Sequence, residues 1–333
     1  MEKGFRALVL DRSADGVIRA AITTLNEEDL PAGSVSVDVE YSTLNYKDGM
    51  ILKGLGRLVR DYPHVPGIDF AGRVSASHDP RFVEGDAVVL TGWGIGERHW
   101  GGYAARARAP GGWLVRLPEG LSTHRAMAFG TAGFTAMLAA DAIEDAGIQP
   151  VDGEVLVTGA GGGVGGIAIA ALAARGYSVT AVTGRAKTLS GRLKGLGARA
   201  VIDRAELAAG SSRPLDKARW AACVDAVGGP LLAAALSQMK EGGVAAACGL
   251  AASGDVCASL LPFLLRGVRL QGVNSVYQPL AVRERIWHRI AGEAPLDAIE
   301  AITETVPLSR VPALADAILA GRVAGRSVVD VRA

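Results

Sequence analysis

The first third of the chain alternates between apolar and polar positions in short runs. From Val35 to Tyr41 every second residue is apolar, with Ser, Asp and Glu between. This period of two is typical of a strand with one buried face. Further short strand-like segments are separated by Pro- and Gly-containing turns, and they cover residues 5–10, 69–74, 87–90 and 103–109. The pattern predicts a small, irregular β-barrel that ends near Leu117-Pro118.

Beyond about residue 150, apolar segments alternate with helical stretches. The apolar segments are Val155–Thr158, Ser178–Thr183, Ala200–Asp203, Ala221–Val227, Val244–Gly249 and Val268–Gly272. Such alternation is typical of a doubly wound parallel sheet with helices on its faces. The fold class predicted from the sequence is therefore α/β, with a β-barrel domain and a Rossmann-type parallel sheet.

The first of these strands runs directly into a cluster of glycines. Between Gly159 and Gly166 only Ala160 and Val164 carry side chains, and an Ala/Ile/Leu-rich helical pattern follows. Glycine lets the turn form and lets a diphosphate approach the N–H groups at the start of the helix. We therefore expect a diphosphate to bind at Gly162, Gly163, Val164 and Gly165. The alternative is a tight strand-to-helix connection without a ligand.

The end of the next strand indicates which dinucleotide binds. About 20 residues beyond the glycine turn, an acidic residue would bind the adenosine ribose of NAD. The chain has Thr183-Gly184-Arg185 there instead. A hydroxyl and a guanidinium suit a 2′-phosphate, which Arg binds through paired hydrogen bonds. We expect NADPH; the alternative for Arg185 is a solvated surface charge.

Composition narrows the class of protein. The chain has 333 residues, so we expect two domains, and its net charge of +1 gives no global field for nucleic acid or a membrane surface. No run reads as long and apolar enough to cross a bilayer. The three cysteines, Cys223, Cys248 and Cys257, have no CxxC spacing, and residues 1–4 show no leader pattern. We expect a cytoplasmic enzyme with free thiols and with neither a nucleic-acid nor a membrane partner.

Several long motifs resemble one superfamily of oxidoreductases. Asn45-Tyr46-Lys47-Asp48, Pro66–Gly72 and Gly85–Val88 are similar to the GroES-like domain of medium-chain dehydrogenases/reductases. Tyr62–Phe70 and Leu90–Gly102 resemble its zinc-free branch of acryloyl-CoA reductases, once labelled quinone oxidoreductases.

The resemblance implies how the domains and subunits are organised. It implies a discontinuous GroES-like catalytic domain of residues 1–127 with 277–333, and a Rossmann NADP-binding domain of residues 128–276. It also implies a homodimer, for which the apolar segment Val268–Val276 would supply a pairing edge.

The resemblance also implies site residues. Tyr46 is a cofactor contact and, with Asn45, a candidate for the reaction itself; the alternative for both is a strand-end cap. The further cofactor contacts that the resemblance implies are Arg204, Leu250, Leu264 and Ser275. For Leu250 and Leu264 the alternative is core packing. Related sequences carry a cofactor-binding Asn near the C-terminus, where this chain has Ala320-Gly321, so a backbone contact replaces it or the contact is lost.

Other polar and aromatic residues near these motifs leave two interpretations open. Asp48 is expected at the helix start or in an ion pair rather than as a base. Trp93 and Trp100 either line the substrate site or pack within their own loop. Arg326 either meets a phosphate of substrate or cofactor or forms a surface ion pair.

A metal is not expected. Zinc members of the superfamily carry His-Glu after the glycine, where this chain has Gly67-Ile68-Asp69, and they use cysteine ligands. No cysteine precedes Cys223, and no histidine has ligand spacing with one. Because Zn²⁺ requires three or four N, S or O ligands, we predict a site without metal.

The resemblance implies a specific reaction. NADPH would reduce the C=C bond of acryloyl-CoA to propanoyl-CoA, by hydride transfer to Cβ and protonation at Cα. An acyl-CoA would then be the small-molecule partner. Two alternatives stay open, an NADPH-dependent quinone or general enone oxidoreductase and a non-catalytic NADPH-binding protein, because all three would share the same cofactor turn.

Overall fold

The computed structural model describes residues 4–209 and 213–333. Residues 1–3, part of the N-terminal stretch in which we expect no leader, lie outside the described residues. The chain packs as two compact units. The first comprises the chain up to Thr131 with Val276–Ala291 and Ile302–Ala333, and the second comprises Ala132–Ser275 with Gly292–Ala301. Helix α9 (Leu296–Glu300) packs on α3 (Gly163–Ala174) in the second unit. The domain bounds predicted from the sequence, 1–127 with 277–333 and 128–276, stay a prediction. They assign α9 to the first domain, whereas it packs in the second unit.

The first unit is built on a seven-stranded, mostly antiparallel sheet. Its path runs β14 (Thr303–Pro307), β15 (Arg326–Asp330), β3 (Val35–Thr43), β4 (Asp69–Ser77), β5 (Ala87–Thr91) and β7 (Val115–Arg116), and β6 (Arg106–Ala109) also pairs with β3. The alternation predicted for 35–41 is confirmed, since Val35, Val37 and Val39 are buried. The C-terminal strand β15 pairs antiparallel with the end of β3.

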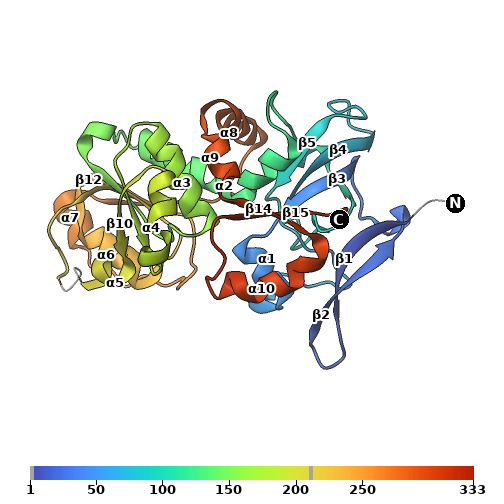
Figure 1. The fold of residues 1–333 in the computed structure, drawn as a ribbon, viewed down its shortest axis with the longest axis horizontal. Coiled ribbons are helices and arrows are strands. Elements are labelled where there is room, and N and C mark those ends of the chain that lie inside the picture. The colour runs from blue at the N-terminus through green and yellow to red at the C-terminus, as the bar shows by residue number, and fades with distance from the viewer. Residues whose placement is uncertain (1–3, 210–212) are drawn as a thin grey trace. The chain divides into compact units, whose positions relative to one another are not determined.

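A hairpin and three helices pack with this sheet in the first unit. Strands β1 (Phe5–Arg12) and β2 (Ile18–Leu25) form the hairpin, drawn in blue in Figure 1. Helix α1 (Tyr46–Leu52) follows β3 and packs against α10 (Val311–Leu319). The two helices approach closely at Gly49, where a Cβ would lie 2.8 Å from Ile318. Helix α8 (Leu280–Glu293) supplies Arg283 to the same unit.

The second unit is a six-stranded parallel sheet surrounded by helices (Figure 1). Its strands lie in the order β10 (Ala198–Asp203), β9 (Val179–Thr183), β8 (Glu154–Val157), β11 (Trp220–Asp225), β12 (Met239–Ala247) and β13 (Arg269–Gly272). Its remaining helices are α4 (Ala186–Gly195), α5 (Arg204–Ala209), α6 (Gly229–Ser237) and α7 (Leu261–Arg266). In chain order this is 3-2-1-4-5-6, the order of dinucleotide-binding folds. All six predicted strands are confirmed, and so is the fold class.

Helix α2 (Thr123–Asp145) carries the chain from the first unit into the second. It is interrupted at Gly130, whose φ of 51° and ψ of −153° are not helical. By length and composition alone, this helix could cross a membrane, since its mean hydropathy is 1.4. The expectation that no segment of the chain is long and apolar enough to do so was therefore wrong. Because 83% of its apolar window is buried in the protein, core packing accounts for its composition. The absence of a membrane partner stays a prediction.

Candidate active site

The glycine run forms a tight turn from β8 into α3. Gly159 has a φ of 60°, and Gly162 is the N-cap of α3. A Cβ at Gly165 would lie 2.5 Å from the carbonyl oxygen of Gly159 and 2.8 Å from the Cα of Ala160. A side chain at Gly165 therefore does not fit unless the backbone moves. The turn leaves the first N–H groups of α3 at the carboxyl edge of the parallel sheet, where such folds bind nucleotides.

The predicted phosphate-binding residues gather beside this turn. A Cβ at Gly161 would lie 3.1 Å from Nη2 of Arg185 and 3.4 Å from Oγ1 of Thr183. On the other side of Thr183, a Cβ at Gly184 would lie 2.9 Å from Nε of Arg204. The structure thus brings Thr183, Arg185 and Arg204 together around two glycines, although Arg204 comes from the start of a different helix.

A buried aspartate, which the sequence analysis did not single out, stabilises the carboxyl edge of the parallel sheet. Asp225 ends β11, and its carboxylate accepts hydrogen bonds from Oγ1 of Thr158 at 2.5 Å and from the N–H of Gly228 at 2.7 Å. Burial raises the pKa of Asp225, while these hydrogen bonds act to lower it. Asp225 thus links the residue after β8 to the loop after β11, and this link holds the glycine turn in place. An Asp at the end of a strand is too common for the sequence alone to reveal this role.

The three remaining candidate cofactor contacts of the second unit lie near its surface. Leu250 is 60% exposed and Leu264 is 73% exposed. The alternative that these leucines are core residues is therefore wrong, whereas a ligand or protein contact stays a prediction. Ser275 is half-buried just after β13. In the first unit, Ala320 is the C-cap of α10 and Gly321 has a φ of 66°, so this pair ends the helix. Whether the backbone of Ala320 and Gly321 contacts the cofactor stays open.

In the first unit a buried polar cluster surrounds Asp69. The Asp69 carboxylate accepts hydrogen bonds from Oγ1 of Thr43 at 2.8 Å, from Nδ2 of Asn45 at 3.1 Å and from the N–H of Thr131 at 2.8 Å. It lies at the start of β4 and is fully buried. The cluster ties the end of β3 and the start of α1 to the interruption in α2, so it holds the Asn45-Tyr46 segment in place.

Asn45 and Asp48 are both engaged within this framework. The N–H of Asn45 donates to Asp48 at 2.8 Å, and the Asn45 amide nitrogen donates to Thr43 and Asp69. The bond from Asn45, the N-cap of α1, confirms the expected role of Asp48 at the helix start. The other oxygen of Asp48 accepts from the N–H of Ile68 at 2.9 Å. Both hydrogens of the Asn45 amide have acceptors here. The geometry therefore favours Asn45 as the cap of α1, and a role in the reaction stays a prediction.

Tyr46, the first residue of α1, differs from its neighbours. Its side chain is 38% exposed, and the phenol makes no hydrogen bond to any residue within 4–209 or 213–333. The next residue, Lys47, forms an ion pair with Glu97 at 3.0 Å, which links α1 to the loop that follows β5. The phenol of Tyr46 is thus held on an anchored helix with its hydrogen-bonding capacity available to a ligand.

Arg326 is buried rather than exposed, so the alternative of a surface ion pair is wrong. Its Nε donates to the carbonyl of Ala128 at 2.8 Å. Gly130 lies beside it, because a Cβ there would be 3.1 Å from Nη2 of Arg326 and 2.7 Å from Oδ2 of Asp69. Burial lowers the pKa of Arg326, and the nearby carboxylates of Asp69 and Asp48 oppose that effect.

The two tryptophans pack against protein. Trp93 stacks on Trp113 with ring centroids 6.2 Å apart, and the Arg283 guanidinium lies over the Trp93 ring at 4.9 Å. Arg283 is buried and donates to the carbonyls of Thr91 and Val276 at 2.6 and 2.7 Å. Trp100 packs on the small apolar cluster that includes Phe5. The partners of both tryptophans lie outside their own loop, so packing within that loop was the wrong alternative, and a place at the substrate site stays a prediction. Arg283, which ties β5 to the segment before α8, was missed.

Metal ligands do not cluster in the part of the chain that the structure describes. Residues 4–209 and 213–333 contain no group of three or more His, Cys, Asp or Glu side chains placed to hold a metal ion. The expected absence of zinc stays a prediction.

Burial of Asp48 predicts a pH-dependent stability. Desolvation, followed by the nearby charge of Asp69, raises the pKa of Asp48 from 3.8 to about 7. Because the folded state holds this proton more tightly, its stabilising contribution is complete below pH 3.8 and is lost as the pH rises through about 7. The free energy of unfolding of the wild type should therefore fall, relative to Asp48→Asn, by up to about 1.4 kcal/mol per pH unit in this window. Denaturant unfolding of both proteins across the window measures it; parallel curves would contradict it.

Comparisons with known proteins place the chain in a family. A model of the alcohol dehydrogenase GroES-like domain matches residues 31–119, and a model described as zinc-binding dehydrogenase matches residues 163–291. The acrylyl-CoA reductase AcuI of Ruegeria pomeroyi is 55% identical over 99% of this chain and 100% of its own.

Two solved structures are similar over nearly the whole chain. The yhdH oxidoreductase of Salmonella enterica, solved in complex with NADP, is 51% identical with a TM-score of 0.94, and the match covers 98% of this chain and 99% of that one. The yhfP protein of Bacillus subtilis, solved with NAD bound, is 44% identical with a TM-score of 0.93 over the same shares. That protein carries the name putative quinone oxidoreductase YhfP. The chain therefore belongs to the medium-chain dehydrogenase/reductase superfamily and, within it, to the AcuI/YhdH family.

Proposed function

We propose that this protein is an NADPH-dependent acryloyl-CoA reductase. The observation that carries the substrate is the 55% identity, over 99% of this chain and 100% of the other, to a relative named acrylyl-CoA reductase. The observation that supports the cofactor is that Thr183 and Arg185 lie against Gly161 of the glycine turn, with Arg204 against the neighbouring Gly184. The reaction reduces the C=C bond of acryloyl-CoA and gives propanoyl-CoA.

The residues at the nucleotide edge fit NADPH. Gly161 and Gly165 keep the turn free of side chains, so a diphosphate can reach the N–H groups at the start of α3. Arg185 and Arg204 supply two guanidinium groups, and Thr183 supplies a hydroxyl, for the 2′-phosphate that distinguishes NADPH from NADH. Since yhfP was solved with NAD bound, the preference proposed here rests on these three residues rather than on family membership.

The chemistry requires a hydride, a place for the developing negative charge and a proton. Bound NADPH supplies the hydride for Cβ of the acryloyl group. We assign the Tyr46 phenol to the thioester oxygen, where a hydrogen-bond donor stabilises the enolate as it forms. The cluster around Asp69 and the cap at Asn45 hold α1 so that this phenol keeps its orientation. Tyr46 as a cofactor contact also stays part of the proposal.

Removing the Tyr46 hydroxyl should slow the reaction. Tyr46→Phe should lower kcat with acryloyl-CoA about a hundredfold, as expected for loss of one donor to a developing oxyanion. Tyr41→Phe is the matched control, because the Tyr41 phenol has no hydrogen-bond partner among the described residues and lies on β3. Single-turnover rates and NADPH affinity should be measured for both. An unchanged kcat in Tyr46→Phe would remove the phenol as a donor and leave it only as a contact surface.

Isotope labelling tests the proposed reaction itself. With NADPH deuterated at the transferable C4 position, mass spectrometry should find one deuterium at Cβ of propanoyl-CoA. With unlabelled NADPH in D₂O, it should find one deuterium at Cα. Absence of propanoyl-CoA would refute the substrate, and deuterium from NADPH at Cα would refute hydride transfer to Cβ.

Quinone reduction is the second candidate function. The observation that favours it is the name of YhfP, which is 45% identical over 98% of each chain. The two candidates share the same cofactor edge, so they are separated by the electron acceptor that the protein reduces fastest.

We also propose a homodimer in the cytoplasm. Among residues 4–209 and 213–333, strand β13 has no neighbouring strand on its outer side, and all four of its residues are exposed. Exposed leucines lie nearby on and before α7 and on β13: Leu260, Leu261, Leu264, Leu265 and Leu270. An unpaired edge beside an apolar patch suits pairing with a second copy across a two-fold axis. The three cysteines are free thiols, which suits a reducing compartment.

A charge placed in this leucine patch should dissociate the dimer. Leu265→Glu should shift the mass measured by light scattering after size exclusion from two chains to one, because the interface would have to bury an unpaired carboxylate. Val151→Glu is the control, since Val151 is a fully exposed apolar residue of the same unit outside the patch. A wild-type protein with the mass of one chain would contradict the proposal.

A further inference from the structure

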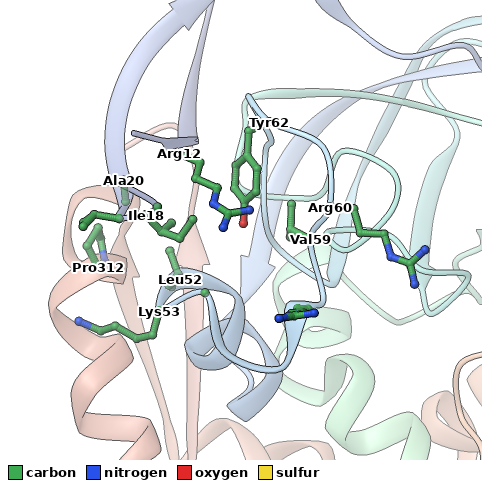
Figure 2. Close-up of a pocket in the computed structure, with 13 residues that line it drawn as sticks. Arg12, Ile18, Ala20, Leu52, Lys53, Val59, Arg60, Tyr62 and Pro312 are labelled. Atoms are coloured by element: carbon green, nitrogen blue, oxygen red, sulfur yellow. The ribbon is translucent and has the colours of Figure 1, made fainter. Parts of the chain in front are cut away.

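A basic pocket in the first unit belongs to none of the sites described above. It has a volume of about 740 Å³ and is lined by the β1–β2 hairpin, the end of α1, the loop from Lys53 to Tyr62, and Pro312 at the start of α10. A volume of this size suits a nucleotide-sized ligand. Figure 2 shows side chains from these separate segments around the same hollow.

The charged side chains that line this pocket are all cationic. They are Arg12, Lys53, Arg57 and Arg60, and none of the lining residues that the structure describes is acidic. Lys53 is paired with Asp316 at 2.8 Å. Arg12, Arg57 and Arg60 form no ion pair with any carboxylate in the described part of the chain. Three uncompensated guanidinium groups in one hollow favour a ligand with several negative charges.

The rest of the lining is suited to a flat organic group. Ile18, Leu52, Val59 and Pro312 give apolar surface, and Tyr62 contributes an aromatic ring. In Figure 2 the Arg12 guanidinium lies next to the Tyr62 phenol. A pocket that combines an aromatic ring, apolar walls and guanidinium groups matches a purine nucleotide with several phosphates better than it matches an inorganic anion.

The loop that carries Arg57 is shaped by unusual backbone geometry. Gly54 and Gly56 have φ values of 65° and 71°, and Arg57 itself has a φ of 50°. A Cβ at Gly54 would lie 2.7 Å from Ile18, so this glycine lets the loop approach β2 closely. A non-glycine residue with positive φ is uncommon, and here it places a guanidinium on the pocket side of the turn.

The pocket also has a definite relation to Tyr46. Helix α1 begins at Tyr46 and ends at Leu52, a pocket residue, and its seven residues span about 10 Å. The two sites therefore lie at opposite ends of one short helix. An acyl-CoA has the same arrangement, because its pantetheine arm separates the thioester from an adenosine that carries a 3′-phosphate and a 5′-diphosphate.

We propose that this pocket binds the 3′-phosphoadenosine diphosphate portion of the acyl-CoA substrate, with Arg12, Arg57 and Arg60 on the phosphates and Tyr62 against the adenine. The inference rests on the proposed function for the identity of the thioester. The binding of the nucleotide itself does not depend on turnover, so the two claims fail separately.

The first experiment compares a full and a truncated substrate. The double variant Arg12→Gln with Arg57→Gln should raise KM for acryloyl-CoA at least about tenfold and leave kcat unchanged. It should leave KM for the N-acetylcysteamine thioester of acrylate unchanged, because that substrate has no nucleotide. Arg19→Gln is the matched control: Arg19 lies between the pocket residues Ile18 and Ala20 on β2, so its side chain points to the other face.

The second experiment measures binding without turnover. Adenosine 3′,5′-bisphosphate is titrated calorimetrically into protein saturated with NADP⁺, which occupies the nucleotide edge of the second unit. The wild type and Arg19→Gln should bind it, and the double variant should lose at least about tenfold in affinity. Unchanged melting temperature and NADP⁺ affinity of the double variant show that the fold is intact.

Three results would overturn the proposal. The first is that the wild type does not bind the bisphosphate. The second is that Arg19→Gln and the double variant lose equal affinity for it. The third is that inorganic phosphate displaces the bisphosphate when both are at the same concentration. If the protein binds the bisphosphate but does not reduce acryloyl-CoA, the pocket stands and the proposed reaction is wrong.

Discussion

Replacing Arg185 and Arg204 together by alanine is expected to lower kcat/KM for NADPH roughly a thousandfold and to leave kcat/KM for NADH unchanged. The reason is that the Arg185 guanidinium lies against Gly161 of the glycine turn and the Arg204 guanidinium lies against Gly184, just after β9. A charge-assisted hydrogen bond to a phosphate is worth about 2 kcal/mol, so two such contacts give about 4 kcal/mol. NADH has no 2′-phosphate and therefore loses nothing.

The control for this prediction is Arg192→Ala. Arg192 is an exposed arginine in the last turn of α4, the helix that begins just after Arg185. Its removal deletes one positive charge, half the change in the double variant, without touching the glycine turn, so it should leave both cofactors unaffected. Equal losses for NADPH and NADH in the double variant would show that the two arginines support the fold or the diphosphate, and the 2′-phosphate assignment would have to be abandoned.

Gly165→Ala is expected to abolish measurable cofactor binding. Its new Cβ would lie 2.5 Å from the carbonyl oxygen of Gly159 and 2.8 Å from the Cα of Ala160, and both are backbone atoms. Relief requires α3 to move away from the turn, which displaces the N–H groups that would bind the diphosphate. The loss of stability should be about 2 kcal/mol or more, as for other overpacked sites.

Gly191→Ala provides the matched comparison. Gly191 lies inside α4, and a Cβ there would meet no atom within 4 Å. This change should stabilise the protein by up to about 1 kcal/mol, because alanine is the better helix former. Thermal unfolding and NADPH titration of both variants measure the two effects. Normal NADPH affinity in Gly165→Ala would contradict the close packing of the turn on α3.

The sequence predicted those features that depend on neighbouring residues. The alternation from Val35 to Tyr41 and the strand–glycine–helix run at Gly159–Gly166 are local signals, and both correspond to the observed elements. Membership of a known superfamily was also evident, because motifs such as Pro66–Gly72 are long. Arg185 lies beside the glycine turn, as its position after β9 indicated.

The rest depended on contacts between residues far apart in the chain. The cluster around Asp69 joins Thr43, Asn45 and Thr131, and no local pattern marks these four as partners. The burial of Arg326 was missed, and the choice between core packing and a ligand contact at Leu264 was left open, because both depend on where neighbouring elements pack. The basic pocket likewise needs cations from two separate segments, the end of β1 and the loop that follows α1, and each cation looks in the sequence like an ordinary surface charge.

The measurement that tests the central claim most directly is a parallel steady-state assay of the purified protein. It determines kcat/KM for acryloyl-CoA with NADPH, for acryloyl-CoA with NADH, and for 1,4-benzoquinone with NADPH. We expect the first to exceed each of the others by at least about a hundredfold, which corresponds to about 3 kcal/mol of transition-state discrimination. Faster turnover of the quinone than of the thioester, or equal use of NADH and NADPH, would contradict it.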